Sequence, residues 1–410
     1  MSACIWYISK YATLPSDRVG ARSFLLMREI ARVGHRPVIF TSDANHLVSR
    51  PAVPGTHLRQ TIDGVEICWV RTRKYHGARS LGRILSWLDF EWRLWRLPKR
   101  DFPQPDVVVA SSLSLFSIFT GLLLRRRYKC RLVFEVRDIW PLTIIEEGGF
   151  SSRNPLVLGL SLVERLAYRH SDAIVGTMPN LEEHVREVAG HRAAPVHCIP
   201  MGFDSEQIDV VEPLPAAFAE EHIPRGKFLV CHAGTIGTTN ALETLFACAQ
   251  AMRDRPDIHF LIVGDGDLKP KYQARWSSLP NLSFVPRVPK AMVQAMLQRC
   301  DLLYLSVHVS KVWRYGQSLN KVIDYMLASR PIIASYSGYP SMIDESGGGT
   351  FVPAGDVGAL KAAILDYADM TSEQRAEIGS AARKWLLQHR GYPQLARQYL
   401  ALAIPEQTLA

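Results

Sequence analysis

The stretch that decides the fold is KFLVCHAGTIGTTNALETLFACAQAMRDRPDIHFLIVGDG, residues 227–266. An apolar run opens it, a segment with apolar residues at helical spacing follows, and a second apolar run ends at a glycine-containing turn. Continuous apolar runs of this length are typical of strands that are buried on both faces of a parallel sheet. The stretch therefore predicts one strand–helix–strand unit of an α/β protein.

The same alternation extends over almost the whole chain. We expect strands at 4–9, 36–42, 65–72, 106–110, 131–136, 173–178 and 196–200, and a second series at 227–234, 258–266, 282–286, 302–306, 330–335 and 349–353. The acidic, proline-containing stretch 204–226 lacks a strand and is interpreted as a linker. The sequence therefore predicts two Rossmann-like doubly wound domains, at 1–203 and 227–385. The helices expected at 386–410 return toward the first domain. Ligands of such folds bind at the carboxyl ends of strands, so we expect the site in a cleft between the domains.

Composition narrows the choice of partners. Hydrophobic residues make up 47% and charged residues 21%, as in ordinary globular proteins, while the formal net charge is +9. A basic excess suits nucleic acid, an anionic membrane surface or a phosphorylated ligand. No nucleic-acid-binding module is recognisable, so nucleic acid is not expected. The seven cysteines show no CxxC spacing, and the chain begins with a strand-like run, which together favour reduced thiols and a cytoplasmic location without a zinc site.

Residues 107–124 form an 18-residue stretch without charge that could be mistaken for a membrane span. It contains four serines, a threonine and a glycine, and it divides into a strand, a serine-rich turn and a helix. We therefore expect a buried strand–helix unit there.

Two glycine-containing turns follow predicted strands. HAGTIG, residues 232–237, contains Gly234 and Gly237, and VGDGD, residues 263–267, contains Gly264 and Gly266. Glycines at such junctions let backbone N–H groups approach an anion at the start of a helix. The alternative is that both are ordinary tight turns, since neither matches a dinucleotide fingerprint.

Charged residues mark two further junctions. EVRDIWP, residues 135–141, places Arg137 and Asp138 at the end of a strand, either as site residues or as a structural ion pair. In YGQSLNKVIDYMLASRPIIAS, residues 315–335, Lys321 at a helix start could reach a phosphate, with Arg314 upstream, and Asp324 could bind a ribose diol. The alternative there is a surface helix with solvated charges.

In order and spacing, these motifs resemble a GT-B glycosyltransferase of family GT4, a retaining family. GARSFLLMREIARVGHRPVIFTS, EVRDIWP, IPMGFD, HAGTIG, LIVGDG, FVPRVPK and RYGQSLNKVIDYMLASRPIIAS carry the resemblance over nearly the whole chain. The VRDIWP and NKVIDYM versions are most similar to a bacterial branch that builds O-antigen, capsule and exopolysaccharide, including N-acetylfucosamine-type transferases. The resemblance implies a hexosyl- or N-acetylaminosugar transferase that uses a nucleotide sugar.

The resemblance also implies roles for individual residues. Gly20 would lie near the donor diphosphate, and Gly234 would begin the phosphate loop. Arg287 and Val288 would border the nucleobase through their backbone. Asp324 matches the second acid of the family's E-x7-E motif, which holds the ribose.

The sequence departs from the family pattern at several of these positions. The first acid of E-x7-E falls at Gly316, and the family's phosphate-binding Arg and Lys fall at Thr235 and Asn240. The nearest cations that could replace them are then Lys321 and Arg314, so the donor-binding set includes Arg314, Asn320 and Lys321.

On the acceptor side, a histidine of many relatives falls at Ser111. Ser111 and Ser112 are therefore placed with the acceptor, and Asp138 and Arg137 become the expected catalytic polar groups. A retaining front-face mechanism needs neither a protein nucleophile nor a metal, because fixed cations and helix N-termini can stabilise the leaving diphosphate. We expect a UDP-sugar rather than a GDP-sugar as donor. The alternatives are a sugar-nucleotide epimerase of GT-B fold and a non-catalytic nucleotide-sugar-binding protein.

A tryptophan- and arginine-rich segment, RILSWLDFEWRLWRLPKR at 83–100, stands apart from these motifs. Trp87, Trp92, Trp95 and Arg96 could contact an anionic membrane at headgroup level. The alternative is a helix that packs its Trp face on the core. Membrane contact would suit a lipid-linked saccharide acceptor and a peripheral position on the inner face of the plasma membrane.

Overall fold

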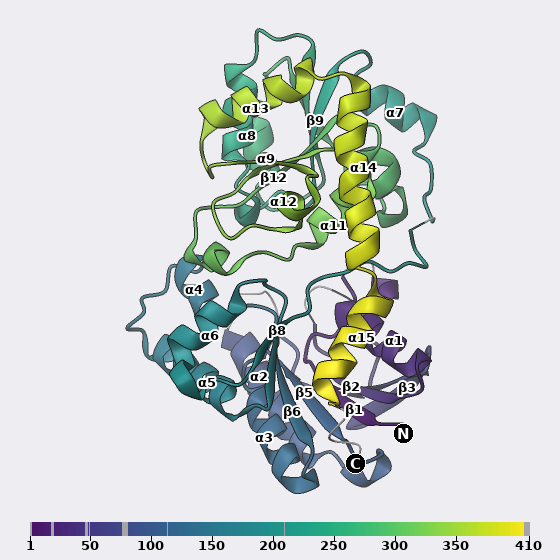
Figure 1. Cartoon of the computed structure of the whole chain (residues 1–410), viewed down its shortest axis with the longest axis vertical. Helices are drawn as coiled ribbons and strands as arrows, with labels where there is room; N and C mark the ends of the chain where they lie inside the picture. Colours follow the sequence, from purple (N-terminus) through teal and green to yellow (C-terminus); the bar gives the residue numbers. More distant parts are fainter. Residues whose placement is uncertain are drawn as a thin grey trace. The chain divides into compact units, whose positions relative to one another are not determined.

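The computed structural model describes residues 2–17, 20–45, 48, 50–75, 81–112, 114–208 and 210–405. The chain forms two compact units. Unit 1 comprises Met1–Pro200 and Tyr392–Ala410, and unit 2 comprises Met201–Gly391. Each unit is an α/β domain built on a parallel sheet, and each is described by itself below (Figure 1).

Unit 1 contains an eight-stranded sheet in the order β3-β4-β2-β1-β5-β6-β7-β8. The pairs are parallel except β3 with β4. The chain runs outward from β1 to one side, then returns to β5 and runs to the other side, so the switch point lies between β1 and β5. The strand bounds are β1 Cys4–Ile8, β2 Arg36–Ser42, β3 His57–Ile62, β4 Val65–Val70, β5 Val107–Ser111, β6 Arg131–Val136, β7 Ala173–Gly176 and β8 Val196–Cys198.

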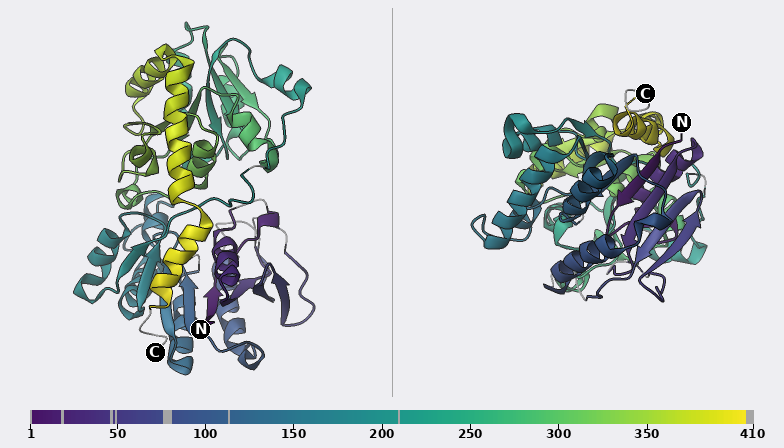
Figure 2. Two further views of the ribbon diagram at one scale, coloured as in Figure 1. Left: turned by 45° about the vertical axis from the view of Figure 1, so that its right-hand side comes forward. Right: turned by 90° about the horizontal axis from the view of Figure 1, so that it is seen from below.

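Helices cover this sheet and supply its cores. One core joins β1 and β2 to α1 and α15, and Figures 1 and 2 show these two helices side by side. Leu395 and Tyr399 of α15 are fully buried in that core, so α15 belongs to unit 1. The helices of unit 1 are α1 Arg22–Arg32, α2 Leu81–Arg96, α3 Ser117–Tyr128, α4 Leu142–Glu146, α5 Pro155–His170, α6 Leu181–Ala189 and α15 Tyr392–Ala403; the short 3-10 turns are η1 Pro15–Asp17, η2 Lys99–Asp101 and η3 Gly190–Arg192.

Strand β3 was not predicted from the sequence. It forms an antiparallel hairpin with β4 at the edge of the sheet, through a turn in which Asp63 and Gly64 both have positive φ. An Asp-Gly pair is the composition that such a turn favours. β3 was missed because its residues are half-exposed or exposed, so it lacks the apolar run by which the other strands were found.

The 18-residue uncharged stretch consists of β5, a turn and the start of α3. This agrees with the expected strand–helix unit. Among the residues that the structure describes, no helix combines the length and the apolar character needed to cross a bilayer.

Unit 2 contains a six-stranded, wholly parallel sheet in the order β11-β10-β9-β12-β13-β14, with its switch point between β9 and β12. The strands are β9 Phe228–Ala233, β10 Ile258–Val263, β11 Leu282–Val285, β12 Leu302–Ser306, β13 Ile332–Ser335 and β14 Gly349–Val352. The helices are α7 Ala216–His222, α8 Glu243–Ala251, α9 Lys269–Trp276, α10 Val293–Leu297, α11 Asn320–Leu327, α12 Met342–Ser346, α13 Val357–Asp369 and α14 Ser372–His389, with η4 Thr238–Asn240, η5 Lys290–Met292 and η6 Lys311–Tyr315.

Both faces of the unit 2 sheet are apolar, and side chains alternate between them with the period of a strand. In β10, Leu261 and Val263 belong to one core, whereas Phe260 and Ile262 belong to the core on the other face. This explains why the strand is a continuous apolar run. The stretch interpreted as a linker, 204–226, lies in unit 2 and contains α7.

Candidate functional site

In unit 2 the candidate site is built around the carboxyl ends of β9 and β12 and the start of α11. Tyr325 of α11 holds these elements together. Its hydroxyl accepts the N–H of Ala233 at 2.9 Å and lies 3.1 Å from the carbonyl oxygen of Tyr304. Because Tyr325 is buried, these bonds place the first turn of α11 over the switch point of the sheet.

Lys321 lies at that first turn, and its ammonium group has no carboxylate partner among the described residues. The Lys321 Nζ atom donates to the side-chain oxygen of Asn240 at 2.5 Å. Burial lowers the pKa of Lys321 to about 7. The first turn of α11 also lacks a side-chain cap, so backbone N–H groups and an ammonium group are available together at one place.

Gly234 makes room for this lysine. A Cβ atom at Gly234 would lie 3.0 Å from Cε and 3.3 Å from Nζ of Lys321, and the backbone there has φ +150°. The neighbouring His232 is fully buried, and neither ring nitrogen has a partner in hydrogen-bond geometry within the described part of the chain. Burial and the charge of Lys321 hold the pKa of His232 well below its usual range, so the imidazole is neutral.

Gly264 and Gly266, the glycines of the turn after β10, are required for a different reason. A Cβ at Gly264 would lie 1.9 Å from the carbonyl oxygen of Gly234, and one at Gly266 would lie 2.3 Å from that of Ile236. The turns after β9 and β10 therefore pack against each other through their backbones, with the Ile236 N–H bonded to Asp265 O at 2.8 Å. These contacts favour the structural interpretation for Gly264 and Gly266.

Asp324 lies one turn further along α11. Its carboxylate oxygens are 2.6 and 2.7 Å from Nζ of Lys290 in η5, and its side chain is 25% exposed. Any ribose bound by Asp324 must therefore share this carboxylate with Lys290. Of the remaining donor-side residues predicted from the sequence, Arg287, Arg314 and Asn320 are exposed, and Val288 is buried in the core.

In unit 1 the predicted catalytic pair follows β6. Asp138 is exposed and Arg137 half-buried. The turn is held by Ser112, whose hydroxyl accepts the Arg137 N–H at 2.9 Å and donates to the carbonyl of Asp138 at 3.4 Å. Ser111 is fully buried at the end of β5, and Gly20 lies exposed after β1, where its carbonyl accepts from the Thr13 hydroxyl.

Beside these residues lies a buried lysine that the sequence analysis did not single out. Lys10 follows β1, is fully buried, and places its ammonium nitrogen 3.3 Å from Ala44 O and 4.8 and 5.2 Å from the ring centres of Tyr11 and Tyr75. Burial and the nearby Arg83 guanidinium lower its pKa to about 7. A charged residue directly after a wholly apolar strand, in CIWYISK, was the signal that could have revealed it.

The Trp-rich segment is the helix α2, and the structure divides its tryptophans. Trp87 is only 4% exposed, and its indole N–H donates to the Tyr11 hydroxyl at 2.7 Å, so the prediction that Trp87 contacts a membrane is wrong. Trp92 and Trp95 are 52% and 45% exposed, on the same face as the exposed Leu85 and Leu88. The Arg96 guanidinium lies 4.8 Å from the ring centre of Trp92.

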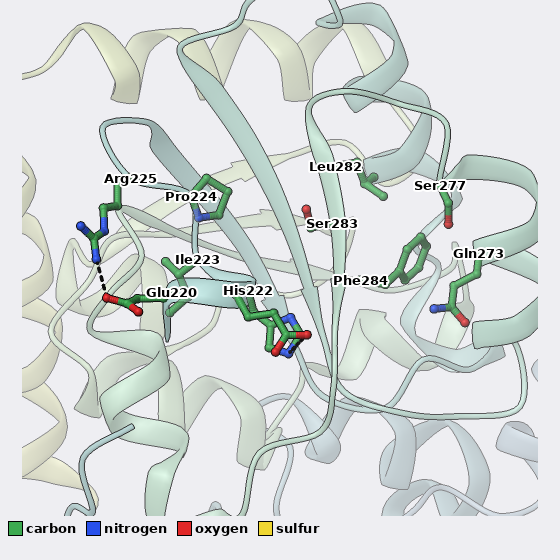
Figure 3. A pocket seen from close by; sticks show the side chains of 11 residues that line it. Glu220, His222, Ile223, Pro224, Arg225, Gln273, Ser277, Leu282, Ser283 and Phe284 are labelled. Atoms are coloured by element: carbon green, nitrogen blue, oxygen red, sulfur yellow. Dashed lines mark hydrogen bonds and ion pairs between the residues drawn. The ribbon is translucent and has the colours of Figure 1, made fainter. Parts of the chain in front are cut away.

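A cavity of about 580 Å³ lies elsewhere in unit 2, between α7, α9 and β11 (Figure 3). Its lining includes Glu220, Glu221 and Arg225, and Glu220 forms an ion pair with Arg225 at 3.0 Å. It is also lined by Leu282, Ser283 and Phe284 of β11, and its carboxylates do not suit a diphosphate. Among the described residues, no group of three or more His, Cys, Asp or Glu is placed to hold a metal ion.

Comparisons with known proteins agree with this geometry. Residues 19–202 match a model described as glycosyl transferase 4-like domain, and residues 227–369 match one described as glycosyl transferases group 1. The chain carries two glycosyltransferase domains. None of the curated proteins matches its sequence.

The solved structures similar to this glycosyltransferase share its fold at low sequence identity. Sucrose-phosphate synthase from Thermosynechococcus elongatus has a TM-score of 0.74 at 17% identity, with 100% of each chain covered. A UDP-forming α,α-trehalose-phosphate synthase from Burkholderia xenovorans has a TM-score of 0.70 at 11% identity, covering 99% of each chain. Anabaena HepE in complex with UDP-glucose has a TM-score of 0.61 at 15% identity, covering 97% of this chain and 98% of the other. The fold is GT-B, two parallel-sheet α/β domains, as the sequence predicted.

Proposed function

We propose that this glycosyltransferase moves a sugar from a UDP-sugar to a lipid-linked saccharide in bacterial surface polysaccharide synthesis, with retention of anomeric configuration. The proposed donor site rests on the environment of the Lys321 ammonium group. Lys321 is half-buried, and its ammonium group lies at an uncapped helix N-terminus without a carboxylate beside it among the described residues. A buried cation is costly unless an anion compensates it.

A diphosphate is the anion that suits this place. Its oxygens can accept from Nζ of Lys321 and from backbone N–H groups of α11, and the absence of a side chain at Gly234 lets them approach. Asn240 stands where the family's lysine is expected, yet its amide oxygen accepts a bond from Lys321. Lys321 of α11 thus supplies, from another element, the cation that the loop after β9 lacks.

The rest of the nucleotide follows from the same segment. Asp324, fixed by Lys290, is the group for the ribose hydroxyls, and the backbone of Arg287 and Val288 borders the base. UDP is favoured over GDP because the names of several structural neighbours specify UDP or UDP-glucose.

The proposed step breaks the bond between the anomeric carbon and the β-phosphate oxygen, and the electron pair leaves with UDP. An acceptor hydroxyl bonds to the anomeric carbon on the same face, and its proton passes to a β-phosphate oxygen. Lys321 stabilises the charge that develops on the diphosphate. Arg137 and Asp138 are proposed as the polar groups near the reacting sugar, with Ser111 and Ser112 behind them on the acceptor side.

The proposed acceptor, a lipid-linked saccharide, is supported by the exposed face of α2. Leu85, Leu88, Trp92 and Trp95 recur there at spacings of three and four residues, which places them in one stripe. Arg96 lies over Trp92 beside that stripe, and aromatic rings with cations are the composition of membrane-interface helices. We propose that this stripe contacts an anionic membrane surface on the cytoplasmic side.

The proposed reaction is tested with purified protein, first with each UDP-sugar alone and then with a polyprenyl-diphosphate saccharide added. If the protein is a transferase, product should form only when both substrates are present. Epimerised donor in the absence of acceptor would identify an epimerase, and unchanged donor in both mixtures would leave a binding protein. A thermal-shift screen of sugar nucleotides selects the donors, because a ligand that binds the folded state raises the melting temperature.

Membrane contact is tested by co-sedimentation with phosphatidylglycerol-containing vesicles. Replacement of both Trp92 and Trp95 by Ser should reduce the bound fraction several-fold. Leu387→Ser, at a similarly exposed apolar residue of α14, is the matched control and should bind like the parent protein. Equal binding by all three proteins would refute contact through α2.

A further inference from the structure

Unit 2 contains another cavity, of about 640 Å³, that the proposed reaction does not use. Three segments line it: residues 211–214 before α7, the end of α10, and the turn that follows α11. Two arginines, Arg299 and Arg330, belong to this lining, and among the described residues that line it there is no Asp or Glu. The cavity in Figure 3 differs in this respect, because Glu220 there pairs with Arg225.

The guanidinium groups of both arginines are largely unused. Arg330 is half-buried; its Nη2 atom donates to the carbonyl oxygen of Gln298, and its Nε atom is buried without a partner in the described part of the chain. Arg299 is exposed and forms no hydrogen bond or ion pair with any described residue. Other arginines of this unit form ion pairs, which are Arg225–Glu220, Arg255–Asp257 and Arg375–Asp301. Since each guanidinium has five N–H donors, the cavity offers positive charge and free donors together.

The turn that carries Arg330 is held in place by α14. A Cβ atom at Gly379 would lie 2.2 Å from the carbonyl oxygen of Ser329, so the helix backbone packs directly against the turn. Arg383 of the same helix donates to the carbonyl oxygen of Leu327 at 2.5 Å. This wall of the cavity is therefore formed by packed backbone and exists before any ligand binds.

The remaining lining indicates the kind of anion that fits. Arginine is suited to phosphate because its planar fork can donate two parallel hydrogen bonds. The Ser329 hydroxyl and the Gln298 amide add neutral hydrogen-bonding groups. The rest of the lining is apolar: Val211, Pro213, Leu214, Ala295 and Ala328. An organic phosphate monoester suits this combination better than a free phosphate ion, because its organic part can cover the apolar lining.

We propose that this cavity binds an organic phosphate monoester, with Arg299 and Arg330 holding the phosphate group. The cavity is separate from the proposed donor site, because Lys321 lies in the first turn of α11 and the cavity begins after the last. The eight residues of that helix, Asn320–Leu327, span about 12 Å at 1.5 Å per residue. The inference does not depend on the proposed reaction.

The test is calorimetric titration of the full chain with phenyl phosphate at fixed ionic strength, beside inorganic phosphate and phenol. Phenyl phosphate should bind more tightly than either of the other two compounds. The double variant R299Q/R330Q should bind it at least about tenfold more weakly, the usual loss for a hydrogen bond between charged groups. Lys321→Met, which disables the proposed donor site, should retain this binding.

Arg225→Gln is the matched control, because Glu220 already neutralises this arginine, and it should leave the affinity unchanged. If the double variant does not fold, Arg299→Gln alone serves, since no hydrogen bond to a described residue is lost, and it should weaken binding several-fold. The proposal is overturned if the parent does not bind phenyl phosphate, if R299Q/R330Q binds it unchanged, or if Arg225→Gln loses as much. Loss of all binding in Lys321→Met would assign the phosphate to the donor site and also overturn it.

Discussion

The charged groups of Arg22 in unit 1 and of Lys321 in unit 2 are held in different ways. In unit 1, Arg22 and Glu135 are both fully buried and form an ion pair at 2.6 Å. Every side of the pair is satisfied: Arg22 also donates to Ile199 O and Pro200 O, and Glu135 accepts from Tyr7 and Tyr399. In unit 2, the ammonium group of the half-buried Lys321 has an amide oxygen as its one hydrogen-bond partner among the described residues. A satisfied buried charge is part of the scaffold, whereas an unsatisfied one indicates where a ligand binds.

The comparison extends to the lysines themselves. Lys99, in unit 1, is buried too, but its ammonium group caps the end of α2 by donating to the carbonyls of Leu94 and Leu97. That is the arrangement expected for a structural lysine at the negative end of a helix dipole. Lys321 lies at the positive end of α11, where its own charge is unfavourable until an anion arrives.

The largest expected effect is on the satisfied pair. Glu135→Ala should lower the free energy of unfolding of unit 1 by about 3–5 kcal/mol, because it leaves Arg22 as an uncompensated buried charge. Calorimetry of thermal unfolding measures this loss of stability. Glu182→Ala breaks the exposed pair with Arg186 in α6 and should cost about 0–1 kcal/mol. Similar losses for both variants would refute the structural role of the buried pair.

A smaller effect is expected at Lys321, where the substitution should weaken ligand binding and not lower stability. Lys321→Met should weaken UDP binding by about 1.5–3 kcal/mol, or about 10- to 100-fold, the contribution of a hydrogen bond to a charged group. The ligand-free variant should be at least as stable as the parent, because a buried charge is removed.

Lys99→Met is the control for this substitution. It should leave the UDP affinity unchanged and lower the melting temperature, because it uncaps α2. Unchanged UDP affinity of Lys321→Met in calorimetry would remove Lys321 from the donor site.

The smallest effect expected is a pH dependence of UDP affinity. The pKa of Lys321 is about 7 in the free protein, and a bound diphosphate raises it by favouring the charged form. Binding therefore takes up a proton above pH 7, and UDP affinity should fall as pH rises, by at most about tenfold per unit between pH 7.5 and 8.5. Calorimetric titration in buffers of different ionisation enthalpy detects the proton that is taken up on binding. A parent protein as insensitive to pH as Lys321→Met would contradict the assignment.

Much of the fold followed from local sequence. The expected strands are present, and most of them are buried on both faces and so carry a continuous apolar run, as β10 does. β8 and β14, each at an edge of its sheet, are partly exposed. β3 escaped prediction because none of its residues is buried, so it carries no apolar run. The division of α2 between Trp87 inside and Trp92 outside was likewise beyond the sequence, since its tryptophans all lie among arginines.

The sequence by itself determined the α/β architecture, the motif order of a GT-B glycosyltransferase and the segment that carries Lys321 and Asp324. Periodicity and turn composition are local properties, and these conclusions needed nothing else. Only the tertiary structure decided that Lys321 meets Asn240, 81 residues away, and that Lys290 holds Asp324. These facts depend on which elements the sheet brings together, and on burial, which sets the energy of each charge and amide.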